Sequence, residues 1–283
     1  MTIIELLAET AASIEKSGIE SARCEAELML SHVLGQKRSH WHFKSTEEVL
    51  LPVELRLRAL LAERLRRVPL QHLLGSTSFC GLEIHVDHRV LVPRPETETL
   101  AECAWTFAKQ LPAPSILDIG TGSGCIAIAI AKHVSVAKIC AMDASSSALA
   151  VAEGNVRLHQ FENRIRFVHG DFSEGLPAEH FDLIVSNPPY IPTGEIASLQ
   201  PEVRIHDPRL ALDGGEDGLA AFRHLAKRAF PKPSNRTTLM MEMGDGQGNA
   251  VAEILQSAGW TVERLVSDLA GCERIIIANA LAS

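Results

Sequence analysis

The chain has 283 residues, more than one average domain, so one large domain and a smaller one are expected. Hydrophobic residues make up 46% of it, enough for a sizeable core, and a net charge of −8 argues against a broad basic surface for nucleic acid. The net charge leaves room for a small local basic patch only. No apolar run reaches the roughly 18 residues of a membrane span, and an acidic amphipathic segment rather than a signal peptide follows Met1.

The cysteines show no Cys-x-x-Cys pair and mostly stand among apolar residues, at positions Cys24, Cys80, Cys103, Cys125, Cys140 and Cys272. A thiol in such surroundings behaves as a small hydrophobic side chain. We therefore expect reduced, buried cysteines, no metal site and a cytoplasmic protein.

Apolar residues recur at three- and four-residue steps through residues 1–75, which predicts helices. Gly18 and Gly35 stand where helices would end, Pro52 stands where a third long helix would begin, and a short helical turn is expected near Ser45. Basic and acidic residues are equal in number here, so the remainder carries the whole net charge. We predict a separate helical domain that meets a partner.

Residues 76–95 change to a period of two, which is typical of strands, and an Asp87-His88 turn between the two runs predicts a β-hairpin linker. Pro95 can then begin a helix. Arg94, just before it, is readily explained as a solvated residue at a helix start, and its role stays open.

Residues 96–283 form the third predicted part, in which strands and helices alternate. The strand candidates are 115–119, 138–142, 165–168, 181–185, 238–242, 262–266 and 274–278, with room for a helix between each pair of the first six. Such alternation predicts an α/β fold with a mostly parallel sheet covered on both faces. The last two strands are joined by a segment too short for a helical crossover, so they should be antiparallel.

The first strand candidate runs into Leu117-Asp118-Ile119-Gly120-Thr121-Gly122-Ser123-Gly124, and a helix follows. Alternate glycines let the backbone approach a ligand closely, and the helix N-terminus offers free N–H groups. The spacing differs from the dinucleotide fingerprint Gly-x-Gly-x-x-Gly, and Asp118 suits a cationic ligand better than a pyrophosphate. The pattern indicates a ligand-binding loop.

Acidic residues end the next two strand candidates. Asp143 lies about 20 residues after Gly120, the spacing at which a carboxylate grips a ribose diol, although it could instead cap the following helix. In Gly170-Asp171-Phe172, the aspartate can accept from the exocyclic amine of adenine while the phenylalanine covers the ring. Each of these motifs alone could be explained without a ligand, but motifs of this kind at the ends of successive strands favour a binding site.

The fourth strand candidate stops at Asn187-Pro188-Pro189-Tyr190, because prolines cannot continue a central strand. Ligands bind at the carboxyl ends of the strands in open α/β sheets. The Asn187 amide and nearby carbonyl oxygens can hold a planar NH2 group, and Tyr190, the one tyrosine in the chain, offers a flat face. The alternative is a turn that merely ends the strand.

Taken in order, these motifs resemble class I methyltransferases that modify a planar nitrogen, and most closely the HemK/PrmC family. The resemblance covers nearly the whole chain and extends to Arg67-Val68-Pro69-Leu70-Gln71, Pro93-Arg94-Pro95-Glu96-Thr97-Glu98, Pro201-Glu202-Val203, Leu212-Asp213-Gly214-Gly215-Glu216-Asp217-Gly218 and Met241-Glu242-Met243-Gly244 with Gln247. Val68 stands where the family usually has a small residue, and Phe172 where some members carry tryptophan.

The resemblance implies a Rossmann-like fold with a mostly parallel seven-stranded sheet and a terminal antiparallel hairpin, preceded by a helical bundle and a hairpin linker. It implies that the cofactor S-adenosylmethionine, which becomes S-adenosylhomocysteine, is contacted by Gly120, Thr121, Gly122, Ser123, Gly124, Asp143, Phe172 and Asn187. It implies that the substrate is held by Asn187, Pro188, Pro189 and Tyr190, of which Asn187, Pro188 and Tyr190 are expected to be catalytic.

The implied reaction is methylation of the side-chain amide of the glutamine in the Gly-Gly-Gln motif of bacterial peptide-chain release factors, with residues 1–75 docking the factor. Two acceptors, the Asn187 side-chain oxygen and the Pro188 carbonyl, would orient the amide, so no general base is assigned. His206 and Asp207 are interpreted as a solvated loop pair. We expect a monomer without a membrane or direct nucleic-acid partner.

Three alternatives stay open at this point. A glutamine methyltransferase of a ribosomal protein would share the chemistry, and a nucleic-acid amino-methyltransferase would share the Asn-Pro-Pro-aromatic tip but should add a basic surface. A catalytically silent cofactor-binding or adaptor protein is disfavoured because the tip is intact. Methylation assays against release factor, ribosomal protein and oligonucleotide would distinguish them.

Overall fold

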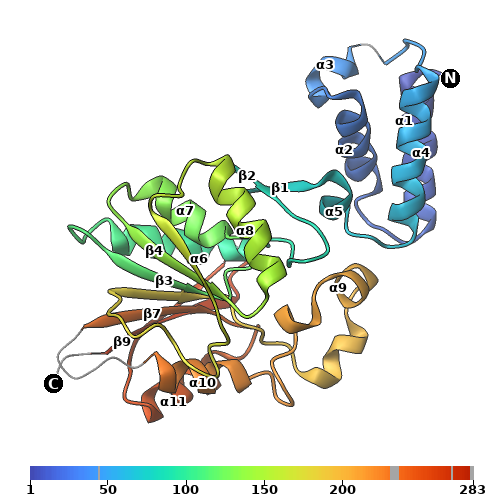
Figure 1. The fold of residues 1–283 in the computed structure, drawn as a ribbon. Coiled ribbons are helices and arrows are strands. Elements are labelled where there is room, and N and C mark those ends of the chain that lie inside the picture. The colour runs from blue at the N-terminus through green and yellow to red at the C-terminus, as the bar shows by residue number, and fades with distance from the viewer. Residues whose placement is uncertain (44, 230–235, 269, 281–283) are drawn as a thin grey trace. The chain divides into compact units, whose positions relative to one another are not determined.

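The computed structural model describes residues 1–43, 45–229, 236–268 and 270–280 (Figure 1). The chain forms two compact units, one of Met1–Gly75 with Pro201–His206 and one of Ser76–Gln200 with Asp207–Ser283. The short segment 201–206 groups with the first 75 residues, which the sequence did not predict. Within the described ranges, no helix has both the length and the apolar character needed to cross a membrane.

The first unit is helical, with α1 (Ile3–Lys16), α2 (Ala22–Leu34), α3 (Arg38–His42), α4 (Leu51–Leu65), α5 (Leu70–Leu74) and α9 (Pro201–His206). The predicted end of α2 at Gly35 is confirmed, because this glycine adopts the left-handed φ of 64°. The predicted helical turn near Ser45 is wrong. The Ser45 carbonyl accepts from the amide of Ile4 at 2.9 Å, so this stretch satisfies the start of α1 instead.

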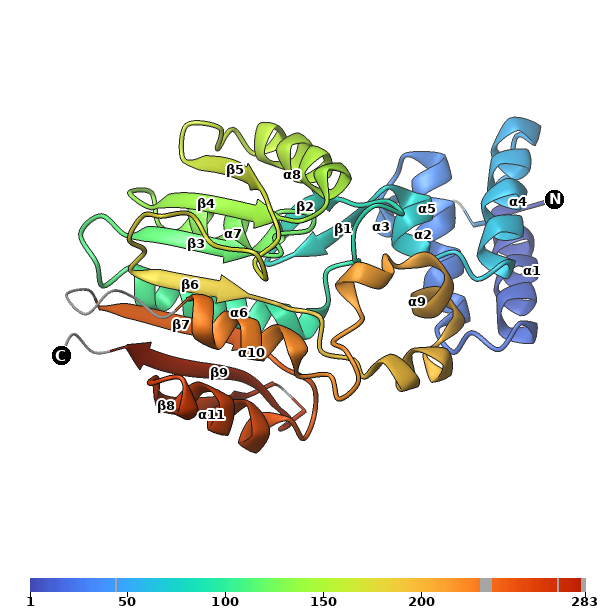
Figure 2. The same cartoon turned by 60° about the horizontal axis from the view of Figure 1, so that its bottom comes forward.

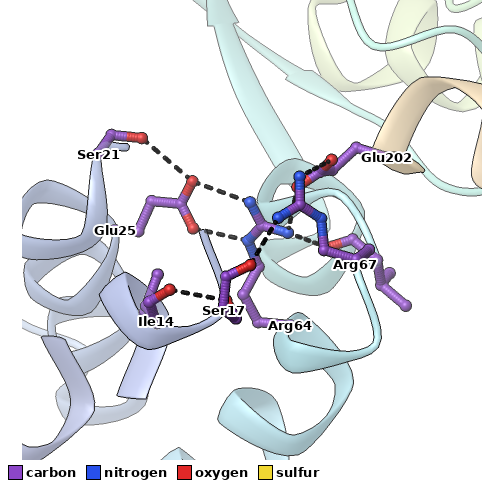
Figure 3. Close-up of polar contacts among 8 residues, drawn as sticks. Ile14, Ser17, Ser21, Glu25, Arg64, Arg67 and Glu202 are labelled. Carbon is purple, nitrogen blue, oxygen red and sulfur yellow. Dashed lines mark hydrogen bonds and ion pairs between the residues drawn. The ribbon is translucent and has the colours of Figure 1, made fainter. Parts of the chain in front are cut away.

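A cluster of ion pairs holds α9 to the other helices of the first unit (Figure 3). The buried Arg64 donates to both carboxylate oxygens of Glu25 at 2.6 and 3.1 Å and to Oε1 of Glu202 at 2.8 Å. Arg67 donates to the other oxygen of Glu202 at 2.8 Å. Burial acts to raise the pKa of Glu202, but hydrogen bonds from its own backbone amide, Arg64 and Arg67 hold that pKa below its usual value.

The second unit is built on a seven-stranded sheet (Figure 2). The strands are β3 (Ser115–Ile119), β4 (Lys138–Asp143), β5 (Ile165–His169), β6 (Leu183–Ser186), β7 (Thr237–Glu242), β8 (Thr261–Ser267) and β9 (Glu273–Ala280). Their order is β5-β4-β3-β6-β7-β9-β8, and β9 runs antiparallel to both its neighbours. The predicted parallel sheet with one reversed strand is confirmed.

Helices cover both faces of this sheet, as the alternating pattern predicted. On one face pack α6 (Pro95–Ala108), α7 (Cys125–His133) and α8 (Ser146–Leu158), and on the other α10 (Ala220–Arg228) and α11 (Gly248–Ser257) (Figure 2). Alternate residues of one strand serve opposite layers, since Ile116 joins the first core and Leu117 the second. No helix fills the described segment 170–182 between β5 and β6, where one was expected. Gly170, Gly175 and Pro177 disfavour one there.

The predicted hairpin is present as β1 (Ser76–Phe79) and β2 (Leu82–His85), but its turn lies at Cys80-Gly81 and not at Asp87-His88. Both turn residues have positive φ, and Phe79 and Ile84 are buried in the core of the second unit. The Asp87 side chain instead accepts from the backbone and guanidinium of Arg89. That local turn lies beyond the last pair of the hairpin, Ser76 with His85.

All six cysteines are free thiols, but not all are buried as expected. Cys125 and Cys140 lie in the sheet-and-helix core, and burial raises the pKa of each, to about 12 and about 11. Cys24 is exposed, because it lies on the solvent side of α2. Among the residues described, no group of three or more His, Cys, Asp or Glu side chains could hold a metal ion.

Candidate functional site

A cavity of about 330 Å³ lies within the second unit at the carboxyl ends of β3, β4, β5 and β6. Of the site residues predicted from the sequence, those that line it are Gly120, Thr121, Gly122, Ser123, Asp143, Phe172, Asn187 and Pro189. Gly124, Pro188 and Tyr190 do not line it. The four strand-end motifs, far apart in the sequence, therefore meet at one hollow.

The glycine loop after β3 places bare backbone at this cavity. Gly120, Gly122 and Gly124 have φ of 69°, 55° and 81°, which residues with a side chain rarely adopt. A Cβ on Gly124 would lie 3.2 Å from the Cβ of Ala152, so this glycine allows α7 and α8 to pack closely. At Gly120 and Gly122 a Cβ would meet nothing nearer than 3.9 Å. Both glycines line the cavity, so their backbone is accessible to a ligand.

Asp143, at the end of β4, ties the glycine loop to the start of α8. Its carboxylate accepts from the backbone amides of Gly122 at 2.8 Å and Ser145 at 2.9 Å. Burial raises its pKa, and these two amide hydrogen bonds partly offset the rise. The cap of α8 is Ser145, whose hydroxyl accepts from the amide of Ala148. Each Asp143 oxygen keeps acceptor capacity for a ligand hydroxyl.

Asp118, which the sequence suggested as a partner for a cationic ligand, does not line the cavity. It is fully buried, and its Oδ2 accepts from the Thr121 hydroxyl at 2.6 Å. Burial raises its pKa to about 7. Asp118 therefore supports the loop from beneath.

The end of β6 presents Asn187 to the cavity with its amide held on one side. Asn187 is half-buried, and its Nδ2 donates to Oγ1 of Thr97 on α6 at 3.1 Å. Its side-chain oxygen is thereby turned away from Thr97. In the described part of the chain, no hydrogen bond is made to the Pro188 carbonyl oxygen. Both oxygens therefore keep acceptor capacity, although of these two residues only Asn187 lines the cavity.

Tyr190 points to a buried carboxylate. Its hydroxyl donates to Oε1 of Glu242, the last residue of β7, at 3.3 Å. Burial raises the pKa of Tyr190 well above its usual value, and the neighbouring Glu242 adds to this. Tyr190 therefore stays protonated and acts as a hydrogen-bond donor.

Two segments, 212–218 and 241–247, surround Asn187-Pro188-Pro189-Tyr190. The sequence pointed to both of them only through the family resemblance. A Cβ on Gly214 would lie 2.9 Å from the Pro189 carbonyl oxygen, and one on Gly218 only 2.5 Å from that of Tyr190. The Gln247 side chain donates to the Tyr190 carbonyl at 3.0 Å. The glycines are required because backbone packs directly on backbone here.

An ion pair beside the cavity was not found from the sequence. Arg94 lines the cavity and donates to Oδ2 of Asp207 at 2.9 Å. The Asp207 side chain is only 1% exposed, so its interpretation as half of a solvated loop pair was wrong. Burial raises the pKa of Asp207 to about 6, and Arg94 opposes the rise. A local sequence pattern cannot predict this ion pair, because Arg94 and Asp207 are 113 residues apart in the chain.

The fold agrees with that of solved methyltransferases. The crystal structure of the hMettl16 catalytic domain superposes with a TM-score of 0.56 at 16% identity, over 79% of this chain and 82% of that one. Residues 98–209 match the family model of the methyltransferase small domain. With six parallel strands and β9 reversed, the second unit is a class I methyltransferase domain.

Residues 5–75 match the family model of the PrmC N-terminal domain. The protein of Caulobacter vibrioides named release factor glutamine methyltransferase is 39% identical over 98% of this chain and 96% of its own length. Its namesake from Geobacter sulfurreducens is 40% identical over 97% and 95%. The chain belongs to the HemK/PrmC family, as its motifs indicated.

Proposed function

We propose that this protein transfers a methyl group from S-adenosylmethionine to the side-chain amide nitrogen of the glutamine in the Gly-Gly-Gln motif of bacterial peptide-chain release factors. The observation that carries the proposal is Asn187, which lines the cavity while Thr97 holds its NH2 group on the other side. An acceptor oxygen so placed can take an amide N–H. Relatives of nearly the same length bear the name of this activity.

The residues around the cavity fit the cofactor. Asp143 has acceptor capacity for the two ribose hydroxyls, Phe172 offers an aromatic face for adenine, and the loop at Gly120 and Gly122 leaves room for close backbone approach. When bound, S-adenosylmethionine supplies an electrophilic methyl group on a sulfonium. Arg94 places a positive charge at the same cavity, and this charge could bind the carboxylate of the cofactor.

The contribution of the protein is orientation. An amide nitrogen is a poor nucleophile, because its lone pair is delocalised into the carbonyl group. The Asn187 side-chain oxygen and the Pro188 carbonyl oxygen accept its two N–H groups and fix the direction of the nitrogen. As positive charge builds on the nitrogen during transfer, both hydrogen bonds strengthen. The methylated nitrogen then loses a proton to water, so no side chain has to act as a base.

The test is a methylation assay with the full-length protein and radiolabelled S-adenosylmethionine. We expect label in an intact release factor and none in a release factor whose Gly-Gly-Gln glutamine is replaced by alanine. A ribosomal protein and an adenine-containing oligonucleotide serve as alternative substrates. Label in either of these, with none in the release factor, would overturn the proposal. Because release factors act on cytoplasmic ribosomes, we expect the protein there.

A further inference from the structure

A buried polar network lies beneath the Asn187 tip. Thr97 is 3% exposed, and its Oγ1 accepts from Nδ2 of Asn187 at 3.1 Å. Glu242 is 1% exposed, and its Oε1 accepts from the Tyr190 hydroxyl at 3.3 Å. The other carboxylate oxygen of Glu242, Oε2, is buried and has no hydrogen-bond partner among the described residues, and the neighbouring Thr97 hydroxyl lowers the pKa of this carboxyl. One carboxylate therefore binds the Tyr190 hydroxyl through Oε1 and keeps a buried, unpaired Oε2 that can accept the hydrogen of the Thr97 hydroxyl.

The direction of these hydrogen bonds decides how the Asn187 amide is turned. A hydroxyl group has one hydrogen to donate and two lone pairs to accept with. If Thr97 donates its hydrogen to the Glu242 carboxylate, it can only accept from Asn187. An Asn187 side chain turned by 180° would set its oxygen against the Thr97 oxygen, with no hydrogen between them. Such a placement leaves a buried acceptor unpaired, which is costly.

We propose that Glu242 and Thr97 are positioning residues that fix the Asn187 amide with its oxygen, and not its NH2 group, toward the substrate amide. This inference rests on the proposed function, because only a substrate that donates N–H groups needs that orientation. Neither residue has to touch the reacting atoms. With the opposite orientation, Asn187 would present a donor to a donor, and the substrate nitrogen would lose one of its two acceptors.

The charge state of Glu242 gives the network a dependence on pH. Burial and the neighbouring Glu96 on α6 raise the pKa of Glu242, while Thr97, Tyr190 and Arg274 on β9 lower it, and the resulting pKa is about 7. The ionised carboxylate is the stronger acceptor for the Thr97 hydroxyl. Methyl transfer should therefore weaken as the pH falls below about 7.

The experiment compares Thr97→Val, which removes the hydroxyl, with Thr97→Ser, which keeps it. Rates of methylation of intact release factor are measured with the full-length variants from pH 6 to 9. We expect kcat of Thr97→Val to fall about 10- to 100-fold, the effect of one unpaired buried group, with KM for release factor nearly unchanged. Because Thr97 also lines the cavity, calorimetry must show that the affinity for S-adenosylmethionine changes far less than kcat. Thr97→Ser should restore most of kcat.

Glu242→Gln supplies an independent readout, because a side-chain amide does not titrate. We expect a lower kcat and loss of the acid limb of the pH profile seen with the unchanged protein. If circular dichroism shows that Thr97→Val does not fold, the test rests on the pH profiles of kcat. The profile of Glu242→Gln is then compared with that of Thr97→Ser, which should keep the acid limb. Failure of the unchanged protein to methylate release factor would count against the proposed function. An active protein whose Thr97→Val and Glu242→Gln variants keep its kcat and pH profile would overturn the positioning role alone.

Discussion

Replacing Asn187 by alanine should separate chemistry from folding at a single position. Asn187 is half-buried, and the hydrogen bond that it loses is the one to Thr97 at 3.1 Å, worth about 0.5 to 1.5 kcal/mol of stability. The preceding residues of β6 keep their pairing with β3 and β7. In the transition state, however, one of two acceptors is missing. By analogy with the loss of one oxyanion-hole donor, kcat should fall about 10²- to 10³-fold.

The assay measures steady-state methyl transfer to release factor together with urea unfolding of the same variant. Tyr190→Phe is the matched control, because it removes a longer hydrogen bond, at 3.3 Å to Glu242, and keeps the ring. We expect it to reduce kcat less than about tenfold. An alanine variant at position 187 that is as active as the unchanged protein, or that does not fold, would refute this account of the β6 tip.

Three further outcomes are expected. Asp143→Ala should weaken binding of S-adenosylmethionine by about 1 to 3 kcal/mol in calorimetry. An unchanged affinity would mean that Asp143 only links the glycine loop to α8 and does not bind the cofactor. Gly218→Ala should lower both stability and kcat, because its Cβ would meet the Tyr190 carbonyl at 2.5 Å, whereas Gly246→Ala, with a similar positive φ but open space, should cost only the backbone strain of about 1 to 2 kcal/mol. The folded-state pKa of Glu242 is raised from 4.5 to about 7, so its contribution to stability is present below about pH 4.5 and lost as the pH rises through 7. Glu242→Gln should therefore be more stable than the unchanged protein at pH 8, by on the order of 3 kcal/mol, and not at pH 4; equal urea midpoints at pH 8 would contradict this.

The strands of the sheet could be predicted from the sequence because their signal is local. Each begins and ends within two residues of its predicted bounds, since an apolar run bounded by turn residues identifies a buried strand by itself. Proline similarly marked where β6 ends. The hairpin turn was misplaced because Cys80, with φ of 49°, is not a typical turn residue, so that Gly81 alone marked the real turn while Asp87 gave a competing signal.

The contacts beneath the site could not be predicted in this way. Thr97 and Glu242 each belong to a recognised motif, but nothing in either segment indicates that they share a network with Asn187. Asp207 was misjudged for the same reason, since a polar residue beside a short helix usually lies in solvent. Its burial depends on Arg94, which comes from a distant part of the chain. Pairings of this kind exist only once the sheet has brought its strand ends together.

The ion pairs of Glu202 with Arg64 and Arg67 make the helical unit less exchangeable than its sequence boundaries imply. A chimera that takes residues 1–75 from a relative would join a foreign bundle to the resident α9, whose Glu202 needs two arginines in register. The Glu202 side chain is 14% exposed, so its carboxylate keeps some contact with solvent, and losing both arginine partners should cost on the order of 1 to 3 kcal/mol. Grafts should therefore carry residues 201–206 with the bundle, and the recombination unit of this chain is discontinuous.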